Sequence, residues 1–502
     1  MKSRFASKQS SEQGLRATTI EEVLVLPDYE IDIATAILLL SKQWDNTEKP
    51  LCPSASLRVD VEEYRKQIDE MAKSLEPIVA KARTPQNIIK AINDYIFEEL
   101  KFDVPKSAIA ASMQCTAEEN EKLFLLHWVL DRKRGNCVGL SVLYLSLAER
   151  LHLPIYGVVV PEHWFVRYDD NETKINIETT DKGKSYSDAY YTKDLKVPTE
   201  TRNLYLVNLS KKQIIGCFLN NIGTTYYERG KLDEAITSYQ TAIRINPNDG
   251  CAYCKLGMAY RSKGEFSLAI AGYKKAIEMK PECADAHVNL GTAYANQGKT
   301  NEAIASYQTA ISINPDDAKA HVNLGAVYQA QGKLEAAIAS YQTAISINPN
   351  DAKAHDNLGV AYANQGNLPE AIASYQTAIS INPNDAIAHV NLGVAYVNQG
   401  KTEAAIASYQ TGISINPNDA VAHVNLGAVY QAQGKLEAAI ASYQTAISIN
   451  PNDANAHYNL ACCYSKLSSQ FRKKPWVECE AYRNPRSHDF VLAEERFFQR
   501  KV

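Results

Sequence analysis

Apolar and polar positions follow two patterns along this 502-residue chain, and the pattern changes near residue 210. Before that point, segments with apolar residues at helical spacing are followed by short apolar runs of strand length. Beyond it, apolar residues keep helical spacing in blocks that recur with a constant period. The chain therefore predicts a mixed domain followed by a repeated helical one.

The mixed domain is expected over residues 19–209, after a flexible N-terminus at residues 1–18. The expected helices cover about residues 31–42, 61–82, 85–100 and 123–131, and another helix begins at Cys137. The expected strands are residues 155–160, 163–168 and 174–178. Helices followed by a run of strands predict an α+β domain.

The second pattern has a period of 34 residues. The prolines that mark each cycle are Pro247, Pro281, Pro315, Pro349, Pro383, Pro417 and Pro451. Glycine and tyrosine keep the same period, a combination that is typical of tetratricopeptide repeats. We therefore expect seven such repeats over residues 216–453, followed by a partial eighth repeat and a capping tail over residues 454–502.

A single cycle explains why the repeats stack. Residues 285–297 predict helix A and residues 301–313 predict helix B of one repeat. Gly291 lets the two helices approach closely, Gly298 ends helix A, and Pro315 prevents helix B from continuing. One helix pair cannot bury its apolar face alone, so the units are expected to form an all-α superhelical solenoid.

One position on helix A, which is expected to line the concave groove, carries asparagine in almost every repeat. These residues are Asn221, Asn289, Asn323, Asn357, Asn391, Asn425 and Asn459, and only Lys255 interrupts the series. Each amide is both donor and acceptor, so the series predicts hydrogen bonds to an extended peptide backbone. It resembles the asparagine ladder in the repeat domain of O-GlcNAc transferase, which implies a protein or peptide partner. The alternative is that asparagine merely suits the repeat consensus.

Two identical segments, residues 321–352 and 423–454, indicate recent internal duplication. A duplicated groove offers the same binding surface more than once.

Lysine and arginine are sparse along the ladder, unlike the basic clamp with which chaperone-binding relatives grip a terminal carboxylate.

Two further series are interpreted as structural. The histidines that keep the 34-residue period are His287, His321, His355, His389, His423 and His457. They stand where the repeat family usually has a bulky packing residue. Cys251 and Cys254 lie one helical turn apart, with Cys217 and Cys283 in neighbouring repeats, but a zinc site needs four converging ligands. No metal site is predicted.

Composition and charge exclude several classes of function. A formal net charge of −4 gives no indication of the basic face that nucleic-acid binding needs. The longest apolar run, residues 36–40, is too short to cross a membrane, and the polar N-terminus lacks a signal-peptide core. A cytoplasmic protein is expected, with its ten cysteines as thiols.

Cys137 and His163 are the candidate nucleophile and base of a catalytic site. Cys137 follows Gly135-Asn136 at a helix N-terminus, where the helix dipole and free N–H groups favour a thiolate and can bind an oxyanion. His163 opens a strand from which it can act as the base. The alternative is that Cys137 is a buried helix residue and His163 an ordinary strand residue.

Glu178 is the candidate third member. If Asp170-Asn171 formed a two-residue hairpin turn, residues paired across the hairpin would sum to 341, as His163 and Glu178 do (163 + 178 = 341). The carboxylate would then orient the imidazole. A hairpin with a register shifted by one residue would separate the two side chains.

The string RGNCVGLSVLYLSLAERLHLPIYGVVVPEHWFVR resembles the transglutaminase-like superfamily, whose cysteine opens the central helix. Together with residues 32–75 it is similar to the SirB-type bacterial branch of that superfamily. The resemblance implies a papain-like fold with Cys137, His163 and an acid as a triad. Many SirB-type proteins have proline in place of Cys137, and the superfamily acid is usually aspartate, so Asp181 is an alternative to Glu178.

Two functions follow from this combination. In one, the domain is a thiol peptidase, amidase or acyltransferase acting on a protein that the repeats recruit. In the other, a relict domain and a peptide-binding solenoid form a non-catalytic scaffold. Neither requires a metal or an organic cofactor, and the sequence does not identify the substrate.

Overall fold

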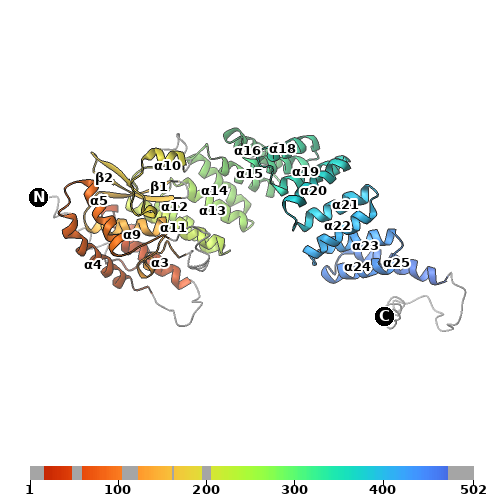
Figure 1. The fold of residues 1–502 in the computed structure, drawn as a ribbon, viewed down its shortest axis with the longest axis horizontal. Helices are drawn as coiled ribbons and strands as arrows, with labels where there is room; N and C mark the ends of the chain where they lie inside the picture. Colours follow the sequence, from red (N-terminus) through yellow and green to blue (C-terminus); the bar gives the residue numbers. More distant parts are fainter. Residues whose placement is uncertain (1–15, 48–58, 105–121, 161–162, 195–204, 473–502) are drawn as a thin grey trace. The chain divides into compact units, whose positions relative to one another are not determined.

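The computed structural model describes residues 16–47, 59–104, 122–160, 163–194 and 205–472 (Figure 1). The chain divides into two compact units, Met1–Ser306 and Tyr307–Val502, and each is described separately below. Most of the expected flexible N-terminus and the tail beyond residue 472 lie outside the described residues. No helix within the described ranges is both long and apolar enough to cross a membrane.

The first unit begins with the α+β domain that the sequence predicts. Its helices are α2 (Ile20–Val25), α3 (Ile33–Thr47), α4 (Val61–Val79), α5 (Pro85–Asn93), α8 (Leu126–Arg132), α9 (Cys137–Arg150) and α10 (Asp188–Asp194). Short turns of 3-10 helix occur at Asp28–Glu30 and Thr179–Asp181. The helix expected over residues 85–100 changes at Asp94 into a π-helical segment, Asp94–Glu99.

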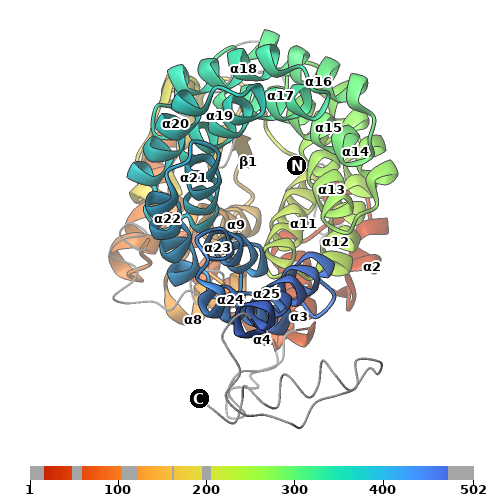
Figure 2. The same cartoon turned by 90° about the vertical axis from the view of Figure 1, so that its right-hand side faces the viewer.

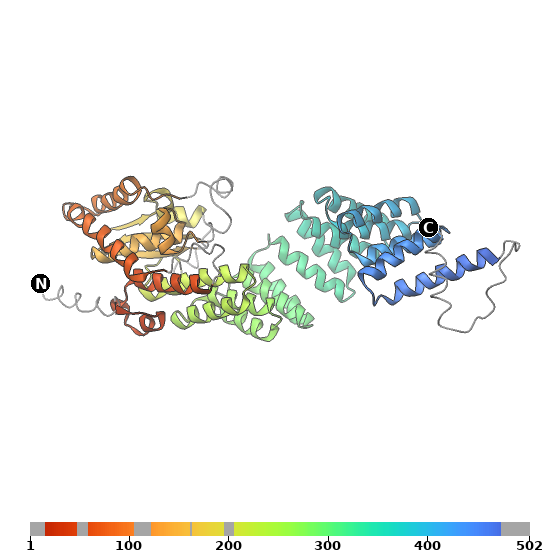
Figure 3. The same cartoon turned by 90° about the horizontal axis from the view of Figure 1, so that it is seen from below.

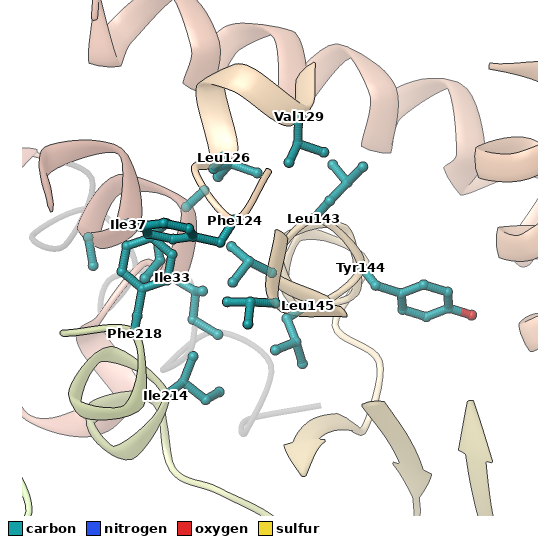
Figure 4. Close-up of a cluster of buried hydrophobic side chains, with 14 of the residues drawn as sticks. Ile33, Ile37, Phe124, Leu126, Val129, Leu143, Tyr144, Leu145, Ile214 and Phe218 are labelled. Carbon is teal, nitrogen blue, oxygen red and sulfur yellow. The ribbon is translucent and has the colours of Figure 1, made fainter. Parts of the chain in front are cut away.

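Helix α9 forms the centre of this domain. Every residue from Val138 to Ala148 is buried. Phe124 and Leu126 pack against one side of α9, together with residues of α3 (Figure 4). On the other side, Tyr144 points away from this cluster, and its hydroxyl donates to Asn93 over 3.2 Å. A helix buried along its length holds its first residue in a fixed place.

The sheet contains three antiparallel strands, β1 (Ile155–Val160), β2 (His163–Asp169) and β3 (Lys174–Ile177), in that order. The two-residue turn predicted at Asp170-Asn171 is wrong, because Asp169 pairs with Lys174 and leaves a four-residue loop. The Asp170 carboxylate accepts the backbone N–H groups of Glu172 and Thr173, which folds the chain into this longer loop. Paired residues consequently sum to 343, for example Val166 and Ile177.

The repeats form antiparallel helix pairs, as predicted. The helices of the first unit are α11 (Lys211–Glu228), α12 (Leu232–Ile245), α13 (Gly250–Ser262), α14 (Phe266–Met279) and α15 (Ala284–Asn296), and α16 (Thr300–Ile313) continues into the second. The second unit contains α17 (Ala318–Ala330), α18 (Leu334–Ile347), α19 (Ala352–Gln365), α20 (Leu368–Ile381), α21 (Ala386–Asn398), α22 (Thr402–Ile415), α23 (Ala420–Ala432), α24 (Leu436–Ile449) and α25 (Ala454–Arg472). In this unit, α19 and α21 lie on the inner side of the curve and α20 and α22 on the outer side (Figure 2).

Close packing within a pair depends on the helix-A glycine. A Cβ atom on Gly359 would lie 2.6 Å from Cε1 of Tyr375 on helix B, and Gly325 stands equally close to Tyr341, at 2.7 Å. Such distances are shorter than any van der Waals contact, so these positions require glycine. The repeated Gly and Tyr of the sequence are therefore one interaction, made once per repeat.

Neighbouring repeats are joined by a recurring hydrogen bond. A helix-B glutamine donates to the hydroxyl of the tyrosine 20 residues later, over 2.9–3.2 Å. The pairs are Gln240–Tyr260, Gln308–Tyr328, Gln342–Tyr362, Gln376–Tyr396, Gln410–Tyr430 and Gln444–Tyr464. Lys274 replaces the glutamine in one repeat and lies over the Tyr294 ring.

The periodic histidines bind the turns between repeats. In each case Nε2 lies 2.9–3.2 Å from the carbonyl oxygen of the proline six residues earlier, as with His321 and Pro315. The sequence interpretation placed them in packing positions. Their observed partner is the turn itself, since the imidazole satisfies a carbonyl that the helices leave free.

The α+β domain and the first repeat share one hydrophobic core. Phe124 meets Phe218 of α11 with ring centroids 5.3 Å apart, and Trp44 meets Tyr226 of α11 at 4.6 Å. Figure 3 shows the red α3 beside the yellow-green α11. The cluster of buried side chains continues as far as Ala259 on α13. Thus the first repeat completes the core of the domain that precedes it.

Ionic contacts hold the start of α11 to the same domain. The Lys211 ammonium binds the Glu149 carboxylate of α9 and the Ile31 carbonyl. Asp28 accepts the backbone N–H groups of Lys211 and Lys212, which caps the helix from outside. Helix α11 is therefore fixed at its N-terminus by charge and along its length by apolar packing.

Candidate functional site

Cys137 is the first residue of α9, and its side chain is half-buried. Asn136 caps the helix, because its side-chain oxygen accepts the N–H groups of Val138 and Gly139 over 3.0 Å each. The Asn136 amide is thus used in the cap, while the Cys137 N–H has no partner among the described residues. A Cβ on Gly139 would lie 2.4 Å from the Leu123 carbonyl oxygen, so glycine is required where α9 begins.

His163 and Glu178 meet in spite of the different register. Nε2 of His163 lies 2.7 Å from Oε2 of Glu178. His163 pairs with Val160 on β1, and extension of the β2–β3 register would place it opposite residue 180. The register differs from the predicted one by two residues, and side chains alternate faces with a period of two. Glu178 therefore remains on the same face, as a diagonal neighbour of His163.

The imidazole lies between the thiol and the carboxylate. Burial opposes a charge on His163, but hydrogen bonds with Cys137 and Glu178, together with their negative charges, raise its pKa from the ordinary 6.5 to about 10. The ring is therefore an imidazolium at neutral pH, and its side chain is 21% exposed.

Two residues that sequence reasoning did not identify hold the Glu178 carboxylate. Thr180 donates both its backbone N–H, over 3.0 Å, and its hydroxyl to Oε1. Tyr191, stacked on Phe165 at 4.0 Å, donates its hydroxyl to Oε2 over 3.3 Å. Burial would raise the pKa of Glu178, but the bonds with His163 and Thr180 outweigh it, so the pKa is lowered. Thr180 follows Glu178 closely in the chain, whereas no sequence pattern indicates Tyr191.

The alternative acid, Asp181, has other partners. Its carboxylate accepts from the Tyr186 hydroxyl and pairs with Lys184 at 3.0 Å. Trp164, the neighbour of His163 on β2, is buried in the core. The structure therefore brings Cys137, His163 and Glu178 together and leaves Asp181 outside this group.

The ladder asparagines all lie on helix A and are half-buried. Their local surroundings differ. Nδ2 of Asn221 is enclosed and has no hydrogen-bond partner among the described residues, and Nδ2 of Asn289 lies 3.9 Å from the Cys254 sulfur. Nδ2 of Asn391 donates to both oxygens of Asp356, over 3.1 and 3.3 Å. Sequence reasoning missed Asp356, although it interrupts a visible series of valines.

The cysteines of the first repeats do not form a metal site with their neighbours. Within the described part of the chain, His, Cys, Asp and Glu side chains do not gather in groups of three that could hold an ion. Burial raises the pKa of the Cys254 thiol to about 12, as expected for a packing residue. Every cysteine among the described residues is a free thiol.

An α+β domain with a helix-opening cysteine, a strand histidine and a carboxylate is the arrangement of a papain-like cysteine domain. Residues 62–220 match the family model of the transglutaminase-like superfamily. Residues 223–260 and 257–298 match the tetratricopeptide repeat model, and residues 284–473 match the C-terminal domain of cilia and flagella-associated protein 70. The chain thus carries a transglutaminase-like domain followed by tetratricopeptide repeats.

Individual relatives are distant. A UPF0162 protein of Xylella fastidiosa is 22% identical over 239 residues, which are 46% of this chain and 75% of that protein. A solved structure of MamA is 30% identical and covers 34% of this chain and 93% of its own, with a TM-score of 0.31. A tetratricopeptide repeat protein from Parabacteroides merdae is 21% identical, covers 50% of this chain and 98% of its own, and has a TM-score of 0.41.

Proposed function

We propose that the transglutaminase-like domain is a cysteine hydrolase or acyltransferase that acts on amide bonds of a protein bound by the repeats. The observation that carries the proposal is the meeting of thiol, imidazole and carboxylate, with Nε2 of His163 2.7 Å from Oε2 of Glu178 and the Cys137 side chain close enough to the same ring to raise its pKa. An imidazolium beside a cysteine stabilises the thiolate, which is the nucleophilic form.

In the proposed reaction, the Cys137 thiolate adds to the carbonyl carbon of an amide. The oxyanion forms beside the helix N-terminus, where the N–H of Cys137 is available to it. His163 gives its proton to the departing amine as the C–N bond breaks, and a thioester remains on Cys137. Water or a second amine, losing its proton to His163, then attacks the thioester and restores the thiolate. Glu178 keeps the imidazole in place throughout.

The repeats supply the partner in this proposal. Tetratricopeptide repeats generally bind proteins or peptides. We infer that the ladder asparagines bind the backbone of an extended peptide from the groove, since they are half-buried on helix A and an amide group can both donate and accept. The free thiols support a reducing compartment, and we assign the protein to the cytoplasm.

The test is alkylation of Cys137 by iodoacetamide as a function of pH, followed by mass spectrometry of the peptide that contains it. Cys251 serves as a control within the same molecule, because it also lies in the first turn of a helix and the described groups that shift its pKa are aspartate, tyrosine and lysine side chains rather than a histidine. We expect Cys137 to react rapidly down to about pH 6, where an ordinary thiol is almost fully protonated. Cys251, whose thiol pKa burial raises, should react only at alkaline pH.

His163→Ala should move the Cys137 profile towards that of Cys251 and leave Cys251 unchanged. Identical Cys137 profiles in wild type and variant, both resembling a free thiol, would contradict the catalytic proposal. The non-catalytic scaffold would then be the better description of the chain.

A further inference from the structure

Asp356 is an acidic residue in an apolar position of the array. The residue three before the helix-A glycine is Val288, Val322, Val390 or Val424 in four other repeats. Two of these valines, Val322 and Val390, are 6% and 8% exposed. A carboxylate in a position where three other repeats bury a valine is costly for folding unless something binds it.

The Asp356 carboxylate lies directly beside the asparagine ladder. It accepts the Asn391 amide through both oxygens, at 3.1 and 3.3 Å, across 35 residues of sequence. The same separation joins Asn289 to Cys254 in the first unit. The residues 35 before Asn357 and Asn425 are Val322 and Val390, which cannot accept a hydrogen bond. The hydrogen bond between a ladder amide and a carboxylate is thus particular to the α19–α21 pair.

Asp356 has no positive partner. Within the described residues its carboxylate forms no ion pair, and its only hydrogen-bond partner is the neutral Asn391 amide. Burial, together with the negative charge of Asp385, raises the pKa of Asp356. The site therefore holds a partly desolvated carboxylate that a cation would stabilise.

Exposed apolar side chains flank Asn391, the partner of this carboxylate, on the next inner helix. Ile387, Asn391 and Val394 lie on one face of α21, at spacings of four and three residues. Ile387 is 64% exposed and Val394 is 39% exposed. The amide that binds Asp356 thus lies between two exposed apolar side chains of α21.

We propose that Asp356 selects a lysine or arginine side chain, flanked by apolar residues, in the extended peptide held by the ladder. This inference rests on the proposed binding of a peptide in the groove. The cation replaces the Asn391 amide on the carboxylate with a charge-assisted hydrogen bond, which is stronger than the bond to a neutral amide. Asn391 is then released to bind the peptide backbone.

The experiment measures retention of two peptide libraries on the immobilised full-length protein. Both contain capped twelve-residue peptides with randomised positions, and their central residue is fixed as lysine in one and as norleucine in the other. Norleucine keeps most of the side-chain length without the charge. Wild type should retain the lysine library about tenfold more strongly, as expected for a hydrogen bond to a charged group.

Asp356→Val and Asp356→Asn should each abolish the preference while both libraries remain bound. Valine is the residue of four other repeats, so this variant keeps the repeat sequence. Asp316→Asn is the matched control, because Asp316 is an exposed turn residue and the later repeats have Asn350, Asn384, Asn418 and Asn452 in its place. It removes the same charge outside the ladder and should behave as wild type.

Three results would overturn the inference. Equal retention of both libraries by wild type would contradict the selection of a cationic side chain by Asp356, while the proposal that the groove binds peptides would stand. Retention of neither library would overturn groove binding as well. A loss of preference in Asp316→Asn equal to that in Asp356→Val would assign the effect to net charge.

Discussion

His163 lies between the Cys137 thiol and the Glu178 carboxylate. Its positive charge stabilises a thiolate on Cys137, and Glu178 keeps the proton on the ring. The pKa of about 10 is far above the ordinary value for histidine. The stabilisation that this shift provides is fully present below about pH 6.5 and is lost as the pH rises through about 10. Glu178 acts in the opposite direction, since its lowered pKa contributes stability that is lost at acid pH.

Replacement of Glu178 by glutamine should lower the pKa of His163. The variant removes the negative charge that holds the proton on the imidazole, so the imidazolium is lost at lower pH. We expect the titration midpoint of His163, followed by the NMR chemical shifts of its ring protons, to fall by about one pH unit, which still leaves the ring charged at pH 6. Tyr191→Phe is the control, because it keeps the ring stacked on Phe165 and removes only the longer bond to Glu178. Equal effects of the two variants would contradict a specific role for the Glu178 charge.

The residues of this site differ in how far the sequence predicted them. Cys137 follows from the helix pattern and its preceding Gly-Asn, and His163 from the strand that it opens. The contact of Glu178 with His163 was predicted from a turn that does not occur. The contact still forms, because a strand register shifted by two residues keeps Glu178 on the same face of the sheet as His163. A shift of one residue would place Glu178 on the opposite face. Tyr191 comes from a separate helix, α10, and only tertiary structure places it beside Glu178.

At the scale of elements, a salt bridge joins the C-terminal part of α9 to the N-terminus of α11. Glu149 near the end of α9 accepts from Lys211 and from the Ile33 N–H. Burial, assisted by the negative charge of Asp32, raises the pKa of Glu149 to about 7, although Lys211 opposes the shift. The helix boundaries were predictable from caps and periodicity. The salt bridge and the hydrogen bond of Glu149 were not predictable, because their partners are 62 and 116 residues away in the sequence.

The raised pKa of Glu149 makes stability depend on pH. Between about pH 4.5 and 7 the folded chain retains a proton that the unfolded chain has released, so the free energy of unfolding falls as pH rises, by at most about 1.4 kcal/mol per pH unit. Glu149→Gln should flatten this part of the profile while its amide oxygen still accepts from Ile33. Denaturant unfolding at several pH values measures the slope. An unchanged slope in the variant would show that other groups cause it.

At the scale of the whole molecule, the hydrophobic core of the α+β domain does not end near residue 210, where the sequence pattern changes. The core of the α+β domain extends through α11 to α13, and aromatic contacts of Phe218 and Tyr226 are part of it. The repeat period identified the solenoid, because proline, glycine and tyrosine keep one register. It did not indicate that the first repeat is also part of the preceding domain, since a repeat pattern describes contacts between repeats alone.

A chain ending at residue 209 should therefore lose cooperative unfolding, because it lacks the side chains of α11 that fill the core. A chain ending at residue 280 retains α11 to α14 and should unfold in a single transition. Thermal unfolding followed by near-ultraviolet circular dichroism distinguishes the two. A native near-ultraviolet spectrum and a sharp transition in the shorter chain would show that the domain folds without the repeat.

The identity of residues 321–352 and 423–454 has a consequence for inheritance. The two segments begin 102 residues apart (423 − 321 = 102), which is three whole repeats. A deletion of residues 321–422 would bring His423 directly after Ala320, with the same sequence following the junction as before. The recurring glutamine–tyrosine bond between repeats would be kept at the junction, because Tyr430 would take the place of Tyr328 beside Gln308. The number of repeats is therefore a trait that can change between generations in whole units, and this particular change would remove Asp356 in the same event.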